Sequence, residues 1–108
     1  NFGQANYAAA KFGLVGLTQT AAKELGEYRI RVNSIHPYGV NTPMGTDQGA
    51  LKMFEKYPHW LPSFAPILTE KPIADVDDIT EAVLFLASDR ARTITGSQMA
   101  LDQGNSKV

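Results

Sequence analysis

The sequence predicts an α/β fold built around a parallel sheet, and three observations lead to this prediction. A long, mostly apolar run over residues 5–26 has the length of a buried helix. Two shorter apolar runs, at 29–35 and 97–101, have the character of strands, and a second helical run lies in the connection between them. A strand, a connection with a helix and another strand form a right-handed unit with parallel strands. Two parallel strands alone make a poor sheet, so we expect this chain to be part of a larger, doubly wound sheet.

The first helix, at 5–26, is expected to be buried or to lie at an interface. Apolar residues cover nearly all of its faces at the start, and polar residues appear only later. Gly26 is the expected cap at its carboxyl end, because glycine readily adopts the left-handed conformation that ends helices. The first strand follows at 29–35, and Pro37 ends its apolar run.

Residues 36–74 are predicted to be a loop, because the prolines gather there, with a short helix at about 47–57. The second strong helix is predicted at 75–88. Its first turn is crowded with aspartates, which the helix dipole favours at that end: Asp75, Asp77 and Asp78. Its buried side is expected to consist of Ala82, Val83, Phe85, Leu86 and Ala87. The chain then reaches the short strand at 97–101.

Composition narrows the classes of function. A chain of 108 residues with 44% hydrophobic residues holds one domain at most. The net charge is −1 and the charges are well mixed, so nucleic acid is not an expected partner. The absence of cysteine excludes disulfides and fits a cytoplasmic location. No apolar run approaches the ~20 residues that span a membrane. The two histidines are far apart with no carboxylate cluster, so no metal site is predicted.

Tyr7 and Lys11 are the strongest candidates for chemistry. They lie four residues apart, so a helix places both on one face, one turn apart. Lys11 is the only charged residue between Tyr7 and Leu17, and an unpaired ammonium is costly to bury. A nearby cation lowers the pKa of a phenol from about 10, which would let a tyrosine act as an acid or base near neutral pH. The alternative is a surface lysine beside a packed tyrosine.

Four segments of the chain, in this order, resemble the short-chain dehydrogenase/reductase family. They are the active-site helix at Asn6–Thr18, the following strand at Ile30–Pro37, the run Leu84–Asp89 with Ile94–Gly96, and the carboxy-terminal Leu101–Gly104. The resemblance implies a Rossmann-like doubly wound sheet. In this family, the residues 1–108 would be the carboxy-terminal catalytic and substrate-loop portion of one domain, whose nucleotide-binding half precedes them.

The resemblance also implies the reaction and its main residues. The family interconverts alcohols and carbonyls with a nicotinamide cofactor, here expected to be NAD, with NADP left open. Tyr7 would be the general acid/base. Lys11 would lower the pKa of Tyr7 and hold the ribose hydroxyls of the cofactor. A small apolar alcohol or ketone is the expected substrate, and a homo-oligomer (dimer or tetramer) is the expected assembly.

The segment after the first strand carries the remaining site residues. It matches the family's cofactor loop except at Tyr38, where the family usually has glycine, and an ordinary turn is the alternative. The residues implied to contact the cofactor are Pro37, Gly39, Val40, Thr42 and Met44. Those predicted to contact substrate are Tyr38, Met44, Phe54 and Trp60, from an apolar lid that could equally pack on the body or on another subunit.

The same loop indicates a subgroup within the resembled family. His36 to Met44, followed by Lys52 to Phe54, resembles the carveol-dehydrogenase-like subgroup, which is described as mycofactocin-coupled and acts on secondary alcohols. The alternative to an enzyme is a non-catalytic fragment or an oligomerisation module, because the Gly-rich dinucleotide loop is not found in these residues.

Overall fold

The computed structural model describes residues 5–38, 55–59, 67–68 and 73–104. Within these ranges the elements are, in order, α1 (Ala5–Leu25), the 3-10 helix η1 (Gly26–Tyr28), β1 (Ser34–Pro37), α3 (Val76–Ala87), the 3-10 helix η4 (Asp89–Ala91) and β2 (Gln98–Leu101). The short helix predicted at 47–57 lies mostly outside the described residues, and inside them Glu55 and Lys56 are helical.

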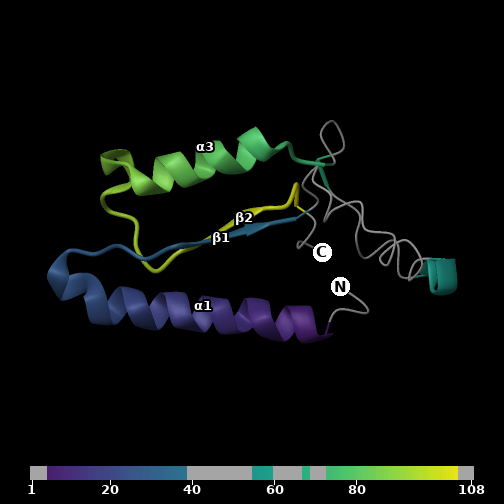
Figure 1. The fold of residues 1–108 in the computed structure, drawn as a ribbon, viewed down its shortest axis with the longest axis horizontal. Helices are drawn as coiled ribbons and strands as arrows, with labels where there is room; N and C mark the ends of the chain where they lie inside the picture. The colour runs from purple at the N-terminus through teal and green to yellow at the C-terminus, as the bar shows by residue number, and fades with distance from the viewer. Residues whose placement is uncertain (1–4, 39–54, 60–66, 69–72, 105–108) are drawn as a thin grey trace.

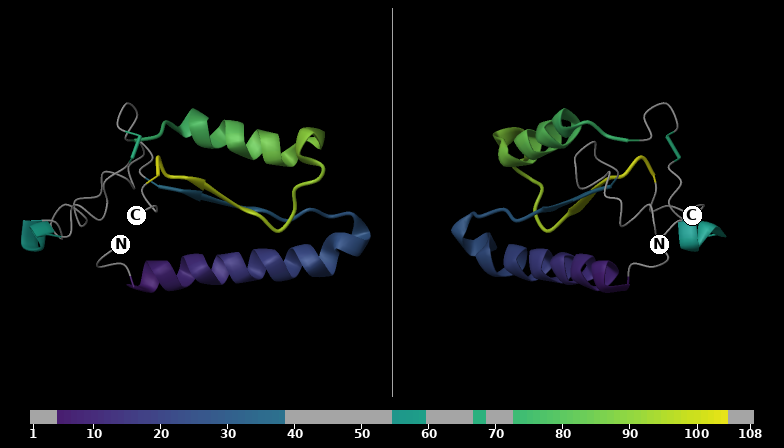
Figure 2. Two further views of the ribbon diagram at one scale, coloured as in Figure 1. Left: turned by 180° about the vertical axis from the view of Figure 1, so that it is seen from behind. Right: turned by 45° about the vertical axis from the view of Figure 1, so that its right-hand side comes forward.

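The two strands form the centre of the molecule. β1 and β2 pair in parallel, in a register that runs from Ser34 opposite Gln98 to Pro37 opposite Leu101. α1 covers one face of this sheet and α3 covers the other (Figures 1 and 2). The described elements therefore form three layers, helix, sheet and helix, which confirms the predicted α/β fold class. The amino-terminal ends of both helices lie at the same end of the molecule as the carboxyl ends of the strands (Figure 1).

One stripe of α1 faces the sheet. Half-buried or buried side chains recur at helical spacing at Lys11, Val15, Thr18 and Ala22. The Thr18 hydroxyl has no water available there and donates to the carbonyl of Leu14, four residues earlier, at 2.8 Å. The outward side of α1 is apolar as well, and it is exposed, most strongly at Phe12 (77%) and Leu17 (65%). The sequence thus predicted correctly that α1 is apolar all round, and only one side is covered within the described residues.

The prediction that Gly26 caps α1 was wrong. The chain continues through Gly26 into η1, and Arg29 takes the left-handed conformation instead, with φ of 61°. The backbone N–H of Arg29 donates to the Gly26 carbonyl at 3.0 Å, and that of Ile30 donates to Leu25 at 3.3 Å. The helix therefore ends by tightening into a 3-10 turn, which satisfies its last carbonyls three residues later than expected.

The first strand also begins later than the predicted 29–35. Residues before Ser34 find other partners, because β2 has not yet begun opposite them. The Val32 carbonyl accepts from the Gly96 N–H at 2.7 Å, and its N–H donates to the Thr95 hydroxyl at 3.1 Å. This part of the chain is bonded to the turn before β2 and not to a strand.

α3 begins at a capping box, which uses two of the aspartates predicted at its start, Asp75 and Asp78. The Asp75 N–H donates to the Asp78 carboxylate at 2.9 Å, and the Asp78 N–H donates to the Asp75 carbonyl at 3.0 Å. The predicted buried side was only partly right. Leu86 is buried and Ala82 is half-buried, whereas Val83, Phe85 and Ala87 are exposed. Only one residue in each turn of α3 is covered by the two strands, at Ile79, Ala82 and Leu86. The apolar side chains next to these residues therefore remain exposed.

Candidate functional site

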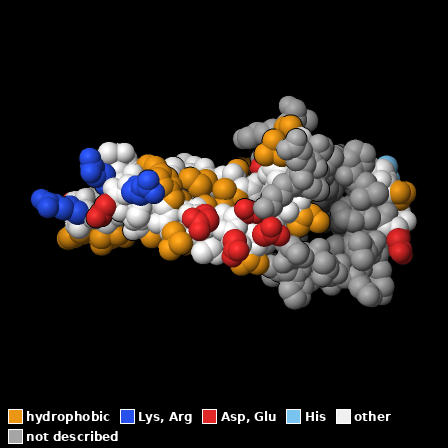
Figure 3. Space-filling model, turned by 90° about the horizontal axis from the view of Figure 1, so that it is seen from above, with side chains coloured by type: hydrophobic (Ala, Val, Ile, Leu, Met, Phe, Trp, Pro, Cys, Tyr) orange, Lys and Arg blue, Asp and Glu red, His pale blue; other side chains and the backbone are white. Residues whose placement is uncertain are grey.

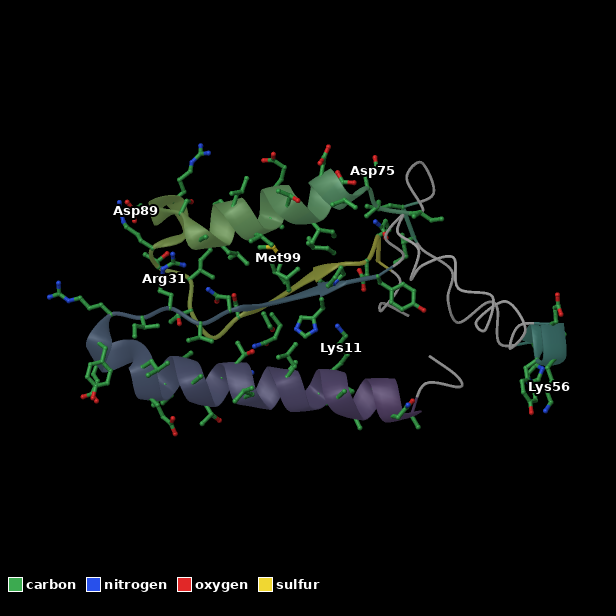
Figure 4. All side chains as sticks on the ribbon, viewed as in Figure 1. Lys11, Arg31, Lys56, Asp75, Asp89 and Met99 are labelled. Atoms are coloured by element: carbon green, nitrogen blue, oxygen red, sulfur yellow. The ribbon has the colours of Figure 1, made fainter. Side chains whose placement is uncertain are left out.

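Lys11, one of the two residues predicted for catalysis, lies among the described residues. It belongs to the sheet-facing stripe of α1, is half-buried, and points from the helix toward the sheet near the carboxyl ends of the strands (Figure 4). The backbone of Tyr7 belongs to the same helix one turn earlier, and its side chain lies outside what the structure describes. In open α/β sheets, ligands bind outside the carboxyl ends of the strands, so Lys11 is placed on the side where a ligand is expected.

The end of β1 brings two further predicted residues to this edge. Pro37 is the last residue of β1, and Tyr38 directly follows it, half-buried. The Tyr38 N–H donates to the Leu101 carbonyl at 3.2 Å, so the start of the predicted cofactor loop is bonded to the end of β2. His36 is bonded within its own strand, with its Nε2 2.7 Å from the Ser34 hydroxyl. This contact holds the His36 ring against its own strand.

The turn that follows β2 also lies at the carboxyl ends of the strands. The Asp102 carboxylate is buried and accepts a hydrogen bond from the Gly104 N–H at 3.0 Å, which closes a tight turn. The carbonyl of Gln103 accepts from the N–H groups of Ile67 and Leu68, at 2.7 and 2.9 Å. The residues just before and just after the predicted substrate loop are therefore bonded to the end of β2 and to the turn that follows it.

The other predicted contacts lie outside the described residues. These are Gly39, Val40, Thr42 and Met44 for the cofactor, and Met44, Phe54 and Trp60 for the substrate. Among the described residues, no group of three His, Cys, Asp or Glu side chains could hold a metal ion. In the same part of the chain, no helix combines the length and hydropathy that crossing a membrane requires.

Sequence reasoning overlooked a polar network at the opposite end of the sheet. The Arg31 guanidinium donates to the carbonyls of Leu86 at 2.8 Å, Ser88 at 3.2 Å and Ile94 at 3.4 Å. It thereby binds the carboxyl end of α3, where a cation is favoured (Figure 4). The signal was present in the sequence, since the polar Arg31 and Asn33 alternate with the apolar Ile30 and Val32.

Asn33 extends this network to the turn before β2. Its amide nitrogen donates to the Ile94 carbonyl at 3.0 Å, and its oxygen accepts from the Ser97 N–H at 3.1 Å and the Ser97 hydroxyl at 2.9 Å. A groove of about 560 Å³ runs beside these residues, lined by Arg29, Arg31, Asn33, Ile35, Val83, Leu86, Ala87 and Asp89. It lies on the α3 face of β1, whereas Lys11 approaches from the opposite face, so it is separate from the candidate site.

Comparison with known proteins identifies the family. A family model described as enoyl-(acyl carrier protein) reductase matches residues 2–106. An uncharacterized NAD-dependent oxidoreductase of Mycobacterium tuberculosis is 45% identical over 103 residues, which cover 94% of this chain and 38% of that protein. A trans-4-hydroxycyclohexanecarboxylate dehydrogenase of Sinomonas cyclohexanicum is 42% identical over 101 residues, or 94% of this chain and 34% of that protein.

A solved structure is similar as well. The crystal structure of a short-chain dehydrogenase from Mycobacterium paratuberculosis bound to NAD superposes with a TM-score of 0.88 at 37% identity, over 96% of this chain and 39% of that one. The chain thus spans between a third and two fifths of the length of the relatives it matches. The match extends over nearly all of its residues, and the chain belongs to the short-chain dehydrogenase/reductase family.

Proposed function

We propose that this chain is the catalytic, carboxy-terminal part of an NAD(P)-dependent oxidoreductase that interconverts a secondary alcohol and a carbonyl compound. The observation that supports this proposal most strongly is the position of Lys11. It is half-buried on the sheet-facing stripe of α1, at the carboxyl ends of the strands and one helical turn from Tyr7. A lysine that served only solubility would lie on the outward side of the helix, where the exposed Phe12 and Leu17 lie instead.

The proposed chemistry divides between Tyr7 and Lys11. Tyr7 accepts the hydroxyl proton when an alcohol is oxidised and returns it to the oxygen when a carbonyl is reduced. The Lys11 ammonium one turn away favours the phenolate form, which lowers the pKa of Tyr7 toward neutrality. Bound NAD supplies the acceptor or donor of the hydride. The protein contributes position and charge, since the proton and the hydride must leave one carbinol group together.

The described residues fit a nicotinamide nucleotide at this edge. The Lys11 ammonium, which points from α1 toward the sheet, suits a ribose diol, because Lys has three donors and no acceptor. Pro37 ends β1 and fixes the direction in which the chain leaves the sheet toward the predicted cofactor residues. The NAD named in the descriptions of the relatives from Mycobacterium tuberculosis and Mycobacterium paratuberculosis supports NAD as the cofactor.

Tyr7→Phe in the complete protein tests the proposal. Phenylalanine keeps the ring and removes the proton that is transferred, so we expect turnover to fall by about 10²–10⁴-fold while the Kd for NAD stays within about twofold. Tyr28→Phe is the matched control, because Tyr28 is 66% exposed beyond the far end of α1. Turnover by Tyr7→Phe at the level of the control would refute the assigned role.

The substrate class is proposed to be a cyclic or terpenoid secondary alcohol. Two observations support it: the loop resembles the carveol-dehydrogenase-like subgroup, and a relative at 42% identity is named for a ring alcohol. A panel containing carveol, trans-4-hydroxycyclohexanecarboxylate and a 3-hydroxyacyl-CoA distinguishes the ring alcohols from the thioesters by kcat/KM. A preference for the thioester would contradict the ring-alcohol proposal and leave the role of Tyr7 intact.

A second candidate function, an oligomerisation module, is favoured by the outward face of α1. Phe12 and Leu17 are exposed, at 77% and 65%, and Leu14, three residues before Leu17, is exposed at 38%. Exposed large apolar side chains of this kind are typical of an interface, so we propose that a homo-oligomer forms through this helix. Phe12→Lys is expected to lower the mass seen by sedimentation, and Glu24→Lys, on an exposed polar part of the same helix, is expected to leave it unchanged.

The face over α3 differs from the outward side of α1. Basic side chains gather at one end of it, acidic ones lie nearer the other, and apolar side chains lie between them (Figure 3). The acidic residues belong to the first half of α3 and the basic ones to η4 and its surroundings, as the sequence shows at Asp77, Asp78, Glu81, Arg90 and Arg92. α3 also exposes large apolar side chains, such as Leu84, but charged residues lie among them, whereas the exposed span from Phe12 to Leu17 of α1 contains no charged residue. The interface is therefore proposed for α1 and not for α3.

A further inference from the structure

The turn after β2 is bonded to both ends of the connection between Tyr38 and Ile67. On one side, the Tyr38 N–H donates to the Leu101 carbonyl at 3.2 Å. On the other, the N–H groups of Ile67 and Leu68 both donate to the Gln103 carbonyl, at 2.7 and 2.9 Å. Tyr38 and Ile67, almost thirty residues apart, are therefore both bonded to residues of the same turn. This turn lies at the carboxyl ends of the strands, toward which Lys11 points.

Gln103 adopts an unusual backbone conformation to make these bonds. Its φ is 52°, in the left-handed region that a residue with a Cβ rarely occupies. Gly104 follows with φ of 79°, and a Cβ on it would lie 2.9 Å from the Cβ and Cδ1 atoms of Ile67. Ile67 thus packs directly on the backbone of Gly104. Glycine would meet the conformational demand at position 103 more easily, so a glutamine there needs another reason.

The side chain of Gln103 supplies that reason. We orient its amide so that Nε2 faces the two neighbouring carbonyl groups, because the opposite orientation would set its oxygen against two acceptors. In this orientation Nε2 donates to the carbonyls of Tyr38 and Asp102, both at 3.2 Å. The carbonyl of Gln103 thus holds Ile67 and Leu68, while its side chain holds Tyr38.

We infer that Gln103 is a positioning residue that clamps the two ends of the Tyr38-to-Ile67 connection together through its main-chain carbonyl and its side-chain amide. The inference rests on the proposed function for its consequence: Tyr38 is a predicted substrate contact, and Gln103 sets its position without touching substrate. A glycine at 103 would keep the carbonyl in place and lose the tether to Tyr38. A glutamate would keep the length of the side chain and set a carboxylate against two carbonyl oxygens.

Hydrogen exchange at individual backbone amides of the complete protein, measured without substrate or nucleotide, tests the clamp. In Gln103→Glu we expect the amides of Tyr38, Ile67 and Leu68 to exchange about tenfold faster, the factor that corresponds to one hydrogen bond of typical net strength. In Gln103→Gly we expect faster exchange at Tyr38 alone. Unchanged exchange at Tyr38 in both variants would overturn the inference.

Gln98→Glu is the matched control. Gln98 lies at the other end of β2, and its amide also donates to a carbonyl, that of Gly96 at 2.8 Å. We expect this variant to leave the exchange of the Tyr38, Ile67 and Leu68 amides unchanged. If it accelerated exchange at those three amides as much as Gln103→Glu does, the effect would be a general loosening of the sheet and the clamp would be refuted.

Kinetics distinguishes positioning from mere stability. For Gln103→Gly we expect KM for the alcohol to rise severalfold while kcat and the Kd for NAD stay within about twofold, because the residue acts only through the placement of Tyr38. A fall in kcat with unchanged KM would overturn this consequence. The exchange result is independent of the proposed function: active Tyr7→Phe would refute that function and leave the clamp standing, and unchanged exchange would refute the clamp whatever Tyr7→Phe does.

Discussion

The two ends of the sheet use polar residues in different ways. At the amino end, Arg31 and Asn33 are bonded to main-chain groups of Leu86, Ser88, Ile94 and Ser97, and they join α3 and the turn before β2 to the start of β1. At the carboxyl end, Tyr38 directly follows β1, and Lys11 points from α1 toward the sheet, as Figure 4 shows for the lysine. The amino end therefore holds the layers together, and the carboxyl end carries the residues that are proposed to act on a ligand.

We therefore expect the residues at one end of the strands to affect stability and those at the other end to affect activity. A polar side chain that replaces lost backbone partners contributes to the free energy of unfolding, because an unsatisfied carbonyl in a partly buried place is costly. A polar side chain held ready for a ligand contributes to turnover and little to folding. Substitutions at the two ends should consequently change different measured quantities, and three of them probe the separation, in order of decreasing expected effect.

The largest effect is expected for Lys11→Met. Methionine keeps the length and the apolar stem of the side chain and removes the charge that favours the Tyr7 phenolate, so turnover should fall by about 10²–10⁴-fold, with a higher Kd for NAD. The free energy of unfolding should change little, since Lys11 is only half-buried. Steady-state kinetics and urea denaturation measure the two quantities. Lys23→Met, an exposed lysine on the same helix, should change neither; equal activity of the two variants would contradict the role of Lys11.

The reverse pattern is expected for Arg31→Met. The substitution removes the guanidinium from three carbonyl groups; that of Ile94 keeps the Asn33 amide and that of Ser88 keeps the Ala91 N–H. We expect the free energy of unfolding to fall by about 1–3 kcal/mol, mainly through the loss of the bond to Leu86. Turnover per folded molecule should stay within about twofold. Urea denaturation gives the first quantity and kinetics below the unfolding transition the second. Arg90→Met, at an exposed arginine in η4, is the control and should be nearly neutral. A loss of turnover larger than the loss of stability would show that the two ends are not separable.

How far the sequence could go follows the same division. The helices, the parallel strands and the capping aspartates were predictable, because periodicity, chain order and local hydrogen bonding determine them. That Lys11 and Tyr7 share one side of α1 was predictable from their spacing, but that this side faces the sheet was visible only in the fold. The end of α1 was not predictable: whether Gly26 or Arg29 takes the left-handed conformation depends on where the next carbonyls find donors, which is a property of the packed structure.

Long-range polar contacts were the other feature of the structure that could not be predicted from the sequence. Across the fold, Gln103 bonds to residues 35 to 65 positions away along the chain, and Arg31 bonds to residues 55 to 63 positions away. No local pattern specifies such pairs, because they form only after the layers are in place. The tyrosine at position 38 shows the limit on the site itself. It departs from the pattern of the resembled family, and its bond to the end of β2 became visible only with the fold.

The smallest effect is expected for Asp78→Ala, which sharpens the comparison because it changes stability at the carboxyl end. The Asp78 carboxylate accepts from the Asp75 N–H at 2.9 Å, and losing this half of the capping box should lower the free energy of unfolding by about 1 kcal/mol. Asp77→Ala removes the same charge from the same turn of α3 without touching that bond, so the difference between the variants in urea denaturation isolates the hydrogen bond. Turnover should be unaffected in both, because neither residue faces Lys11 across the sheet. An equal loss of stability in the two variants would show that charge near the helix terminus, and not the capping box, stabilises the start of α3.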